Sequence, residues 1–382
     1  MPTEISQRCR AISPSATLTV DARAKAMRAE GIDVIGFGAG EPDFNTPQVV
    51  LDAFKEALDR GQTRYTPVAG TLELRTAIAD FEREKNGMDY APDEVIVTVG
   101  ATEALFTALF GILNPGDEVI VPTPAFGLYE SIIALCRGTF VALPTENNAF
   151  QISREMIESA ITPRTKAIIL NSPNNPTGIV YTPETLKNIH EAVAGKEIFV
   201  LCDDVYRQLV YADEYHSFAE FRDLREQIMV IQSFSKPYAM TGWRVGYLLC
   251  DLPVKKELEK VHQFSVVSAA STSQKACVEA LKSDPSPMRE TYRRRRDFAL
   301  SRLNEMGLDV CKPEGAFYLF PSIEKFGMDS ATFCTRMIHE AGLAATPGFC
   351  FGSDHHIRLT YCYSDEELAE GLNRLERFIR SL

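Results

Sequence analysis

The sequence predicts an α/β fold built on a mainly parallel sheet, and its pattern of apolar runs supports this. Five short runs, rich in β-branched residues, alternate with longer amphipathic segments. They cover residues 94–99, 117–122, 166–170, 197–202 and 228–232. Nearly uniform apolarity is typical of strands covered by helices on both faces. The intervening segments are long enough to form crossover helices.

The pattern of predicted elements changes near residue 284 and divides the 382-residue chain into two parts. The turn-forming segment 283–287 precedes a charged stretch that predicts a helix over about 288–306, and shorter elements follow. The N-terminal residues hold one predicted helix and one strand, too little for a domain. We therefore predict a large domain over 48–285 and a smaller α+β domain made of 1–47, including an N-terminal arm, and 286–382.

The charge balance restricts the partners of this protein. A net charge of −12 argues against nucleic acid, because an acidic protein repels phosphates. The chain has no apolar leader and no run of about eighteen apolar residues, so we expect neither export nor a membrane span. The basic run at 293–296 is flanked by acidic residues and is interpreted as a solvated helix face.

The cysteines and histidines give no sign of a metal site. Nine cysteines occur without a C-x-x-C pair, which is typical of reduced, mostly buried thiols and favours a cytoplasmic protein. His355 and His356 are adjacent, so they cannot form a metal pair on one helix face. We predict no metal.

The most informative stretch begins at Ser233, directly after the last apolar run. It contains Ser235 and Lys236, and Arg244 follows eight residues later. A lysine at the end of a buried strand can lose its proton through desolvation and become a nucleophile toward an aldehyde. The two serines and the arginine are suited to a phosphate. A solvated surface lysine is the ordinary alternative.

Two polar motifs follow other apolar runs. The sequence NSPNNPTG, which contains Asn175, closely follows residues 166–170, although any tight turn has a similar composition. The sequence CDDVY, with Asp203 and Tyr206, stands at the end of the run 197–202. A helix cap and helix packing are the ordinary alternatives for these two residues, and Asp204 competes with Asp203.

Two further segments suggest a ligand site. The turn VGATEAL places Gly100, Ala101 and Thr102 between a predicted strand and a helix, where free amide groups can bind phosphate. The segment PTPAFGLY carries Phe126, an aromatic ring for stacking. Taken alone, each is weak, because such turns and core aromatics are common.

Together these motifs resemble the signatures of fold-type I pyridoxal 5′-phosphate (PLP)-dependent aminotransferases, among them S-x-S-K-x7-R-x-G and N-x-P-x-N-P-T-G. The matches run from about residue 11 to residue 375. They are most similar to class I subgroup γ, the bacterial aspartate aminotransferase branch. The resemblance implies a large domain with a mainly parallel seven-stranded sheet.

The resemblance also implies a role for each matched residue. Lys236 forms a Schiff base with the cofactor and shuttles the substrate proton, and Asp203 keeps the pyridine nitrogen protonated. The phenolic oxygen is contacted by Asn175 and Tyr206, and Phe126 stacks on the ring. The implied phosphate contacts are Gly100, Ala101, Thr102, Ser233, Ser235 and Arg244.

Substrate and subunit contacts complete the resemblance. Arg358, in HIRLTY, matches the arginine that binds the substrate α-carboxylate, a group that suits its two-donor fork. Gly40 matches a backbone contact to that carboxylate, with Asn175 beside it. Tyr65, in RYTPVAG, matches a tyrosine that reaches the phosphate of a neighbouring subunit, which implies a homodimer.

The predicted function is transfer of an amino group from an L-amino acid to a 2-oxo acid by a ping-pong mechanism. The expected donor is aspartate or another amino acid paired with glutamate and 2-oxoglutarate. Phe126 departs from the tryptophan of several aspartate-specific relatives and offers no hydrogen-bond donor, which weakens the case for aspartate. An aromatic or alanine aminotransferase, a C–S or β-lyase, and a non-catalytic regulatory module remain alternatives.

Overall fold

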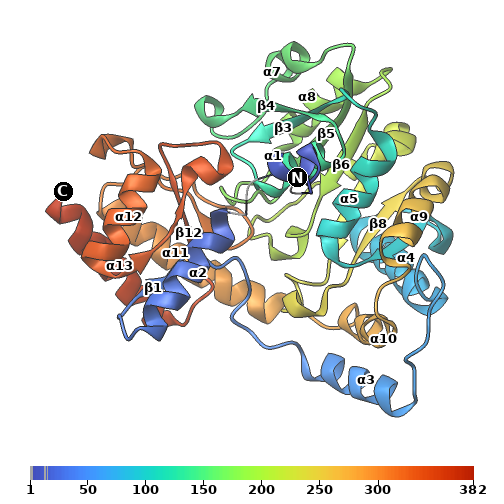
Figure 1. Ribbon diagram of the computed structural model, residues 1–382, viewed down its shortest axis with the longest axis horizontal. Helices are drawn as coiled ribbons and strands as arrows, with labels where there is room; N and C mark the ends of the chain where they lie inside the picture. Colours follow the sequence, from blue (N-terminus) through green and yellow to red (C-terminus); the bar gives the residue numbers. More distant parts are fainter. Residues whose placement is uncertain (1–2, 13, 15) are drawn as a thin grey trace.

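A seven-stranded sheet forms the centre of the computed structural model, which describes residues 3–12, 14 and 16–382 (Figure 1). The strand order is β2-β8-β7-β6-β5-β3-β4, and only β8 runs antiparallel to its neighbours. The strands are β2 (Val95–Thr98), β3 (Glu118–Thr123), β4 (Thr139–Pro144), β5 (Thr165–Asn171), β6 (Phe199–Asp203), β7 (Ile228–Ser233) and β8 (Gly246–Cys250). The predicted mainly parallel sheet is confirmed.

The five apolar runs correspond to β2, β3, β5, β6 and β7, whereas the runs missed β4 and β8. Strand β4 is an edge strand with several exposed side chains, and the prediction overlooked its short apolar run, residues 140–143. Strand β8 is fully buried, but it lies directly behind the lysine motif, whose polar residues hide its pattern.

Helices cover both faces of the sheet because its side chains alternate between two buried clusters. In β3, Val119 and Val121 belong to one cluster and Ile120 to the other. The first cluster includes α5 (Gly100–Ile112), α6 (Leu128–Leu135) and α9 (Leu252–Val266). The second includes α3 (Gln48–Asp59), α4 (Leu72–Asn86), α7 (Arg154–Ala160), α8 (Pro183–Val193) and α10 (Ser271–Ala280). This layering buries each strand on both sides.

The C-terminal part has its own buried cluster, beside a three-stranded antiparallel sheet of order β11-β12-β9. Its elements are β9 (Tyr318–Leu319), β10 (Leu343–Ala344), β11 (Thr346–Pro347), β12 (Ile357–Thr360), α11 (Ser286–Glu305), α12 (Ser330–Ala341) and α13 (Asp365–Ser381). The N-terminal part joins it, since β1 (Ile35–Gly36) pairs with β10. Figure 1 shows α2 (Ala16–Ala29) beside these elements. The separate cluster supports the division at residues 48 and 285, which remains a proposal.

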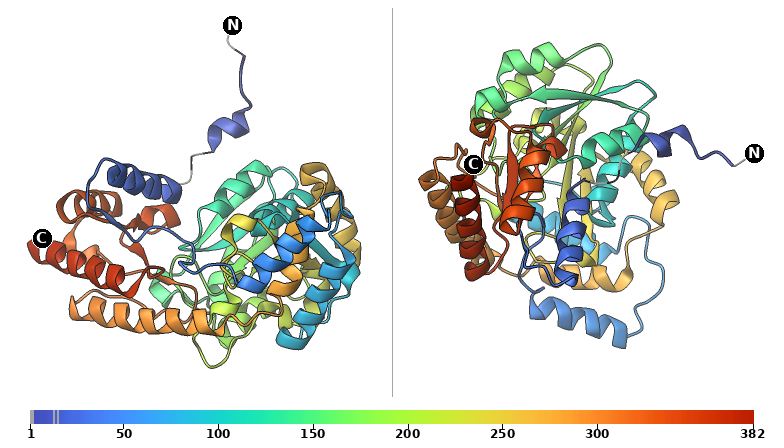
Figure 2. Two further views of the ribbon diagram at one scale, coloured as in Figure 1. Left: turned by 90° about the horizontal axis from the view of Figure 1, so that it is seen from below. Right: turned by 60° about the vertical axis from the view of Figure 1, so that its left-hand side comes forward.

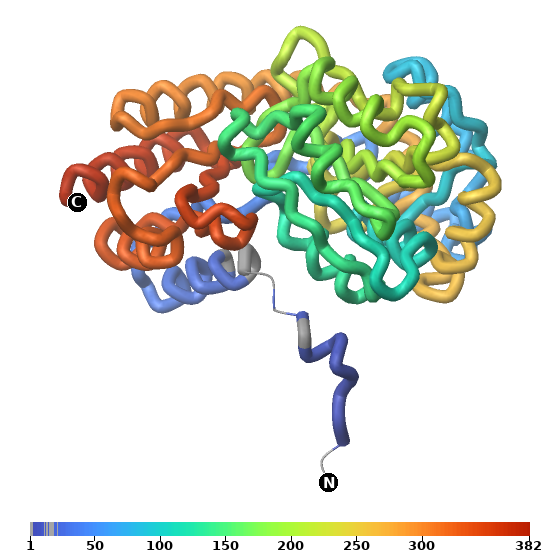
Figure 3. The backbone as a smooth tube through the Cα atoms, turned by 90° about the horizontal axis from the view of Figure 1, so that it is seen from above, coloured from blue at the N-terminus to red at the C-terminus, as the bar shows by residue number. Residues whose placement is uncertain are grey.

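The N-terminal helix α1 (Gln7–Ala11) projects from the rest of the chain (Figures 2 and 3). The Arg8 guanidinium donates a hydrogen bond of 3.5 Å to the Leu135 carbonyl and so connects α1 to the body of the chain. Among the described residues, no helix is both long and apolar enough to cross a membrane.

The basic run in α11 corrects one prediction. Arg293 is solvated and pairs with Glu290, but Arg295 and Arg296 are buried. Arg295 binds Asp43 at 2.8 Å, so it connects α11 to the N-terminal segment. The solvated-face interpretation was therefore wrong for half of the run, because sequence reading did not see which face packs inward. The nine cysteines, all in the described part, are free thiols, and six are buried, as predicted.

Candidate active site

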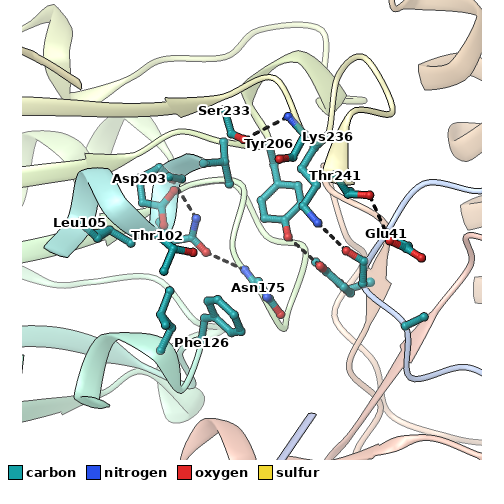
Figure 4. Close-up of a pocket in the computed structure, with 18 of the residues that line it drawn as sticks. Glu41, Thr102, Leu105, Phe126, Asn175, Asp203, Tyr206, Ser233, Lys236 and Thr241 are labelled. Atoms are coloured by element: carbon teal, nitrogen blue, oxygen red, sulfur yellow. Dashed lines mark hydrogen bonds between the residues drawn. The ribbon is translucent and has the colours of Figure 1, made fainter. Parts of the chain in front are cut away.

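A cavity of about 420 Å³ opens where β5, β6 and β7 end, facing the C-terminal part of the chain (Figure 4). The carboxyl ends of parallel strands are the usual site of ligand binding in open α/β sheets. Most predicted site residues line this cavity. They are Gly40, Ala101, Thr102, Phe126, Asn175, Asp203, Tyr206, Ser233, Ser235, Lys236, Arg244 and Arg358.

Two predicted site residues lie outside the cavity lining. Gly100 is adjacent to it, at the start of α5 with a φ of +75°, and a Cβ there would stand 2.5 Å from Nη2 of Arg244. Glycine is therefore required both for the backbone angle and for the close approach of Arg244. Tyr65 is 91% exposed in this single chain and contributes nothing to its own cavity.

Lys236 enters the cavity just beyond the end of β7 (Figure 4). Its ammonium donates a hydrogen bond of 2.5 Å to the Gly40 carbonyl and lies 6.0 Å from the ring of Tyr206. Burial lowers the pKa of Lys236 to about 8, and the positive charges of Arg358 and Arg244 act in the same direction. A lysine in this state is a better nucleophile at neutral pH than a solvated one.

Asp203, the last residue of β6, presents an unsatisfied carboxylate oxygen. Tyr129 donates a hydrogen bond of 2.6 Å to Oδ2, whereas the buried Oδ1 has no partner within the described chain. Burial raises the pKa of Asp203 to about 6, and the hydrogen bond from Tyr129 opposes this. An unpaired buried acceptor is costly, so Oδ1 is suited to a donor on a ligand.

The neighbouring Asp204 faces a different environment and does not line the cavity. Its Oδ2 accepts a hydrogen bond of 2.7 Å from Ser217 and lies 3.7 Å from the Arg207 guanidinium. Arg207 in turn binds Glu82 at 2.7 Å in a buried ion pair. The geometry thus separates two adjacent carboxylates that the sequence left in competition: Asp203 faces the cavity and Asp204 faces a structural network.

Arg358, on β12, is buried and held from several sides. Its Nη1 donates to Asn175 Oδ1 at 2.8 Å, and its Nη2 donates to the Gly38 carbonyl at 2.8 Å. The guanidinium lies 4.6 Å from the ring centre of Tyr318 and 4.9 Å from that of Phe351. These contacts orient a planar two-donor fork at the cavity wall, the geometry that suits a carboxylate.

The opposite end of the cavity is suited to an anion. The first turn of α5 presents Ala101 and Thr102, and free amides at a helix start attract negative charge. Ser233 Oγ accepts a hydrogen bond of 3.0 Å from the amide of Ser235, and Arg244 is exposed at the rim. Two hydroxyl groups, a helix N-terminus and an arginine together form a cradle that is suited to a phosphate group.

Among the cavity-lining residues that sequence reasoning missed are four with polar side chains close to the predicted site residues. Tyr129 and Asn171 lie within predicted motifs, but the predicted roles were given to other residues of those motifs. Asn171 donates a hydrogen bond to the Asp203 carbonyl and accepts one from the Asn175 amide, both at 2.8 Å. Tyr318 and Glu41 carried no signal of their own. Tyr318 is an aromatic among apolar neighbours, which is typical of a core strand, and Glu41 is one acid in a turn.

Comparison with known proteins agrees with this geometry. Residues 32–375 match the family model of aminotransferases of class I and II. The chain therefore belongs to this family of PLP-dependent enzymes and is an amino-acid aminotransferase. The predicted enzyme class is confirmed.

Individual relatives cover nearly the whole chain. A protein of Bacillus subtilis named "Probable N-acetyl-LL-diaminopimelate aminotransferase" is 44% identical over 92% of this chain and 90% of its own length. The aspartate/prephenate aminotransferase of Thermus thermophilus is 39% identical, with 98% of each chain covered. The structure of the aspartate aminotransferase of Thermus thermophilus with maleate superimposes with a TM-score of 0.95 at 38% identity, covering 98% of this chain and all of that one. This likeness confirms the predicted fold.

Proposed function

We propose that this chain binds PLP at Lys236 and uses it to move an amino group from an L-amino acid to a 2-oxo acid. The observation that carries the proposal is the unpaired, buried Oδ1 of Asp203 in the same cavity as a lysine of lowered pKa. A protonated pyridine nitrogen would satisfy that oxygen. When bound, the cofactor supplies an electron sink for the charge left when a substrate Cα–H bond breaks.

The other cavity residues fit the remaining parts of the cofactor. Asn175 and Tyr206 offer donors to its phenolic oxygen, and Phe126 offers a ring face. Asp203 holds the pyridine nitrogen in its charged form. The phosphate is assigned to the cradle formed by Gly100, Ala101, Thr102, Ser233, Ser235 and Arg244.

Lys236 then acts as the base that moves the substrate proton. With a pKa of about 8, the Lys236 amine is neutral in roughly a tenth of the molecules at pH 7. The amine of an ordinary lysine is neutral in well under a thousandth of them. A general base works best when its pKa lies near the working pH. Arg358 binds the substrate α-carboxylate and fixes its orientation, so that the same Cα proton faces Lys236.

We assign aspartate as the leading donor, on the names of relatives that cover almost the entire chain, and keep 2-oxoglutarate as the expected acceptor. N-acetyl-LL-diaminopimelate is a second candidate, because the 44% identical relative carries that name. The test is a panel of aspartate, alanine, phenylalanine and N-acetyl-LL-diaminopimelate with 2-oxoglutarate, with glutamate release measured. Aspartate should give the highest kcat/KM. Ammonia and an oxo acid without glutamate would instead indicate a lyase.

We further propose a homodimer in which Tyr65 completes the neighbouring phosphate site. Tyr65 is 91% exposed, and Phe264, at the end of α9, is 88% exposed. Phe110, on the adjacent α5, is 51% exposed. Large apolar side chains gathered on packed helices are typical of a covered interface.

Mixing two inactive variants tests this arrangement. Lys236→Ala keeps Tyr65, and Tyr65→Ala keeps Lys236, so a mixed dimer has one site with both residues if the tyrosine crosses to the partner. Activity should then return after subunit exchange. If each site used its own tyrosine, no mixed dimer would hold a complete site and the mixture would stay inactive. Light scattering on the wild type gives the oligomeric state independently.

A further inference from the structure

Tyr318 lies between three site residues that come from distant parts of the chain. It is buried on β9 and lines the cavity. Its hydroxyl is 2.6 Å from that of Tyr206, and its ring centre is 4.6 Å from the Arg358 guanidinium. A Cβ on Gly40 would stand 3.0 Å from the Tyr318 hydroxyl. Tyr318 therefore touches both the cofactor side and the substrate side of the cavity.

We propose that Tyr318 is a positioning residue that joins the two sides of the active site: its hydroxyl orients Tyr206 and its ring supports Arg358. This inference rests on the proposed function of the cavity, because Tyr206 matters only if it faces a bound cofactor. Two separate contacts of one side chain carry it, and the hydroxyl contact can be removed while the ring contact is kept.

Binding of the cofactor to Tyr206 decides which hydroxyl donates in the hydrogen bond between Tyr206 and Tyr318. A phenol has one proton to donate. If Tyr206 donates that proton to the phenolic oxygen of the cofactor, Tyr318 has to donate to Tyr206. Burial raises the pKa of Tyr206 well above its ordinary value and that of Tyr318 to about 12, so both stay protonated donors at neutral pH. A chain of two donors polarises and strengthens the terminal hydrogen bond.

The ring contact acts on the substrate side. The Arg358 guanidinium lies 4.6 Å from the ring centre of Tyr318 and 4.9 Å from that of Phe351, and its Nε has no partner within the described chain. The rings therefore add to the hydrogen bonds from Nη1 and Nη2 in fixing the plane of the guanidinium. Stacking of this kind favours one orientation of the fork and disfavours the others.

Two variants separate the contacts. Tyr318→Phe keeps the ring and removes the hydroxyl, whereas Tyr318→Leu removes both. Tyr361→Phe is the matched control, since Tyr361 is fully buried in the same part of the chain and does not line the cavity. The readouts are the apparent pKa of the visible absorbance of the PLP-loaded protein and the dissociation constant of maleate, a dicarboxylate without an amino group.

A weaker donor on the phenolic oxygen leaves more negative charge there, so the nitrogen that joins Lys236 to the cofactor holds its proton more tightly. Tyr318→Phe should therefore raise the absorbance pKa by about 0.5 or more, a threefold change in proton affinity, with maleate binding within twofold of wild type. Tyr318→Leu should show the same rise and bind maleate about 5- to 20-fold more weakly. Tyr361→Phe should change neither.

The titratable groups that face Tyr206 and Tyr318 are Tyr129, Asp203, Lys236, Arg358 and Cys362, and all are unchanged in these variants. A double variant sharpens the test: in a Tyr206→Phe background, Tyr318→Phe should add no further shift, because the relay is already broken. An independent shift there would overturn the relay.

An absorbance pKa in Tyr318→Phe within 0.1 of wild type would overturn the hydroxyl role, and unchanged maleate affinity in Tyr318→Leu would overturn the ring role. Both results leave the proposed function standing, provided that the wild type takes up PLP. A wild-type protein that takes up no PLP would overturn the proposed function and this inference together.

Discussion

The two walls of the cavity are built in different ways. The cofactor wall carries Asn175, Asp203 and Lys236, which lie at or just beyond the ends of three neighbouring strands of one sheet. The substrate wall carries Gly40, Tyr318 and Arg358, which come from segments far apart in the chain. Sheet geometry fixes the first wall, and packing between distant segments fixes the second. We infer that the first wall determines the chemistry and the second the choice and orientation of substrate.

The largest effect should come from Lys236→Ala, at the centre of the cofactor wall. Loss of both nucleophile and base should lower kcat by at least about 10⁴-fold. Lys255→Ala is the control, since Lys255 is also buried but pairs with Glu259 on α9, outside the cavity. A single-turnover assay of both proteins would contradict the assignment if Lys236→Ala retained turnover within tenfold of wild type.

Asp203→Asn should be the next largest. The amide cannot hold the pyridine nitrogen in its charged form, so kcat should fall by about 10²- to 10³-fold while PLP still binds through its phosphate. The adjacent Asp204→Asn removes the same charge from the structural network instead, and should lower thermal stability with far less effect on kcat. Equal losses of kcat in the two variants would show that the adjacent carboxylates are not separated in role.

The same substitution should change the stability of the apoprotein in a pH-dependent way. Because the pKa of Asp203 is raised to about 6 in the folded state, the wild type loses stability as the pH rises from about 4 to about 6. Asp203→Asn avoids this loss and should be more stable at pH 7, on the order of 3 kcal/mol, with the difference vanishing near pH 4. Urea unfolding at both pH values measures it. A stability difference between the two proteins that is the same at pH 4 and pH 7 would contradict a raised pKa.

A smaller effect is expected on the substrate wall. Arg358→Lys removes the planar fork and its stacking, so kcat/KM should fall about 10- to 100-fold, mostly through KM. PLP affinity should change little. Arg336→Lys, on the surface of α12, is the control and should be silent. If the main loss in Arg358→Lys were in PLP binding, the division between the two walls would fail.

The two walls also differ in how well the sequence predicted them. Asp203 and Lys236 each follow an apolar run, so the strand pattern alone places them at one edge of a sheet. Gly40 and Arg358 were found only through the family resemblance, because no local pattern brings residues 40 and 358 together. Tyr318 was missed entirely, since its partners Tyr206 and Arg358 become neighbours only after folding.

The same reason explains the error in α11, whose buried side depends on Asp43, about 250 residues earlier in the chain. Strand β4 is a different case, because its short apolar run at 140–143 is visible in the sequence and was overlooked. Patterns that repeat within one element are visible in a sequence. Contacts between distant elements are not.

The most direct test of the central claim is chemical trapping at Lys236. The wild-type protein is incubated with PLP, reduced with borohydride and digested, and the modified peptide is identified by mass spectrometry. We predict one pyridoxyl group per chain, on Lys236. A label on another lysine, or no label at all, would contradict the assignment of this residue and with it the proposed chemistry of the cavity.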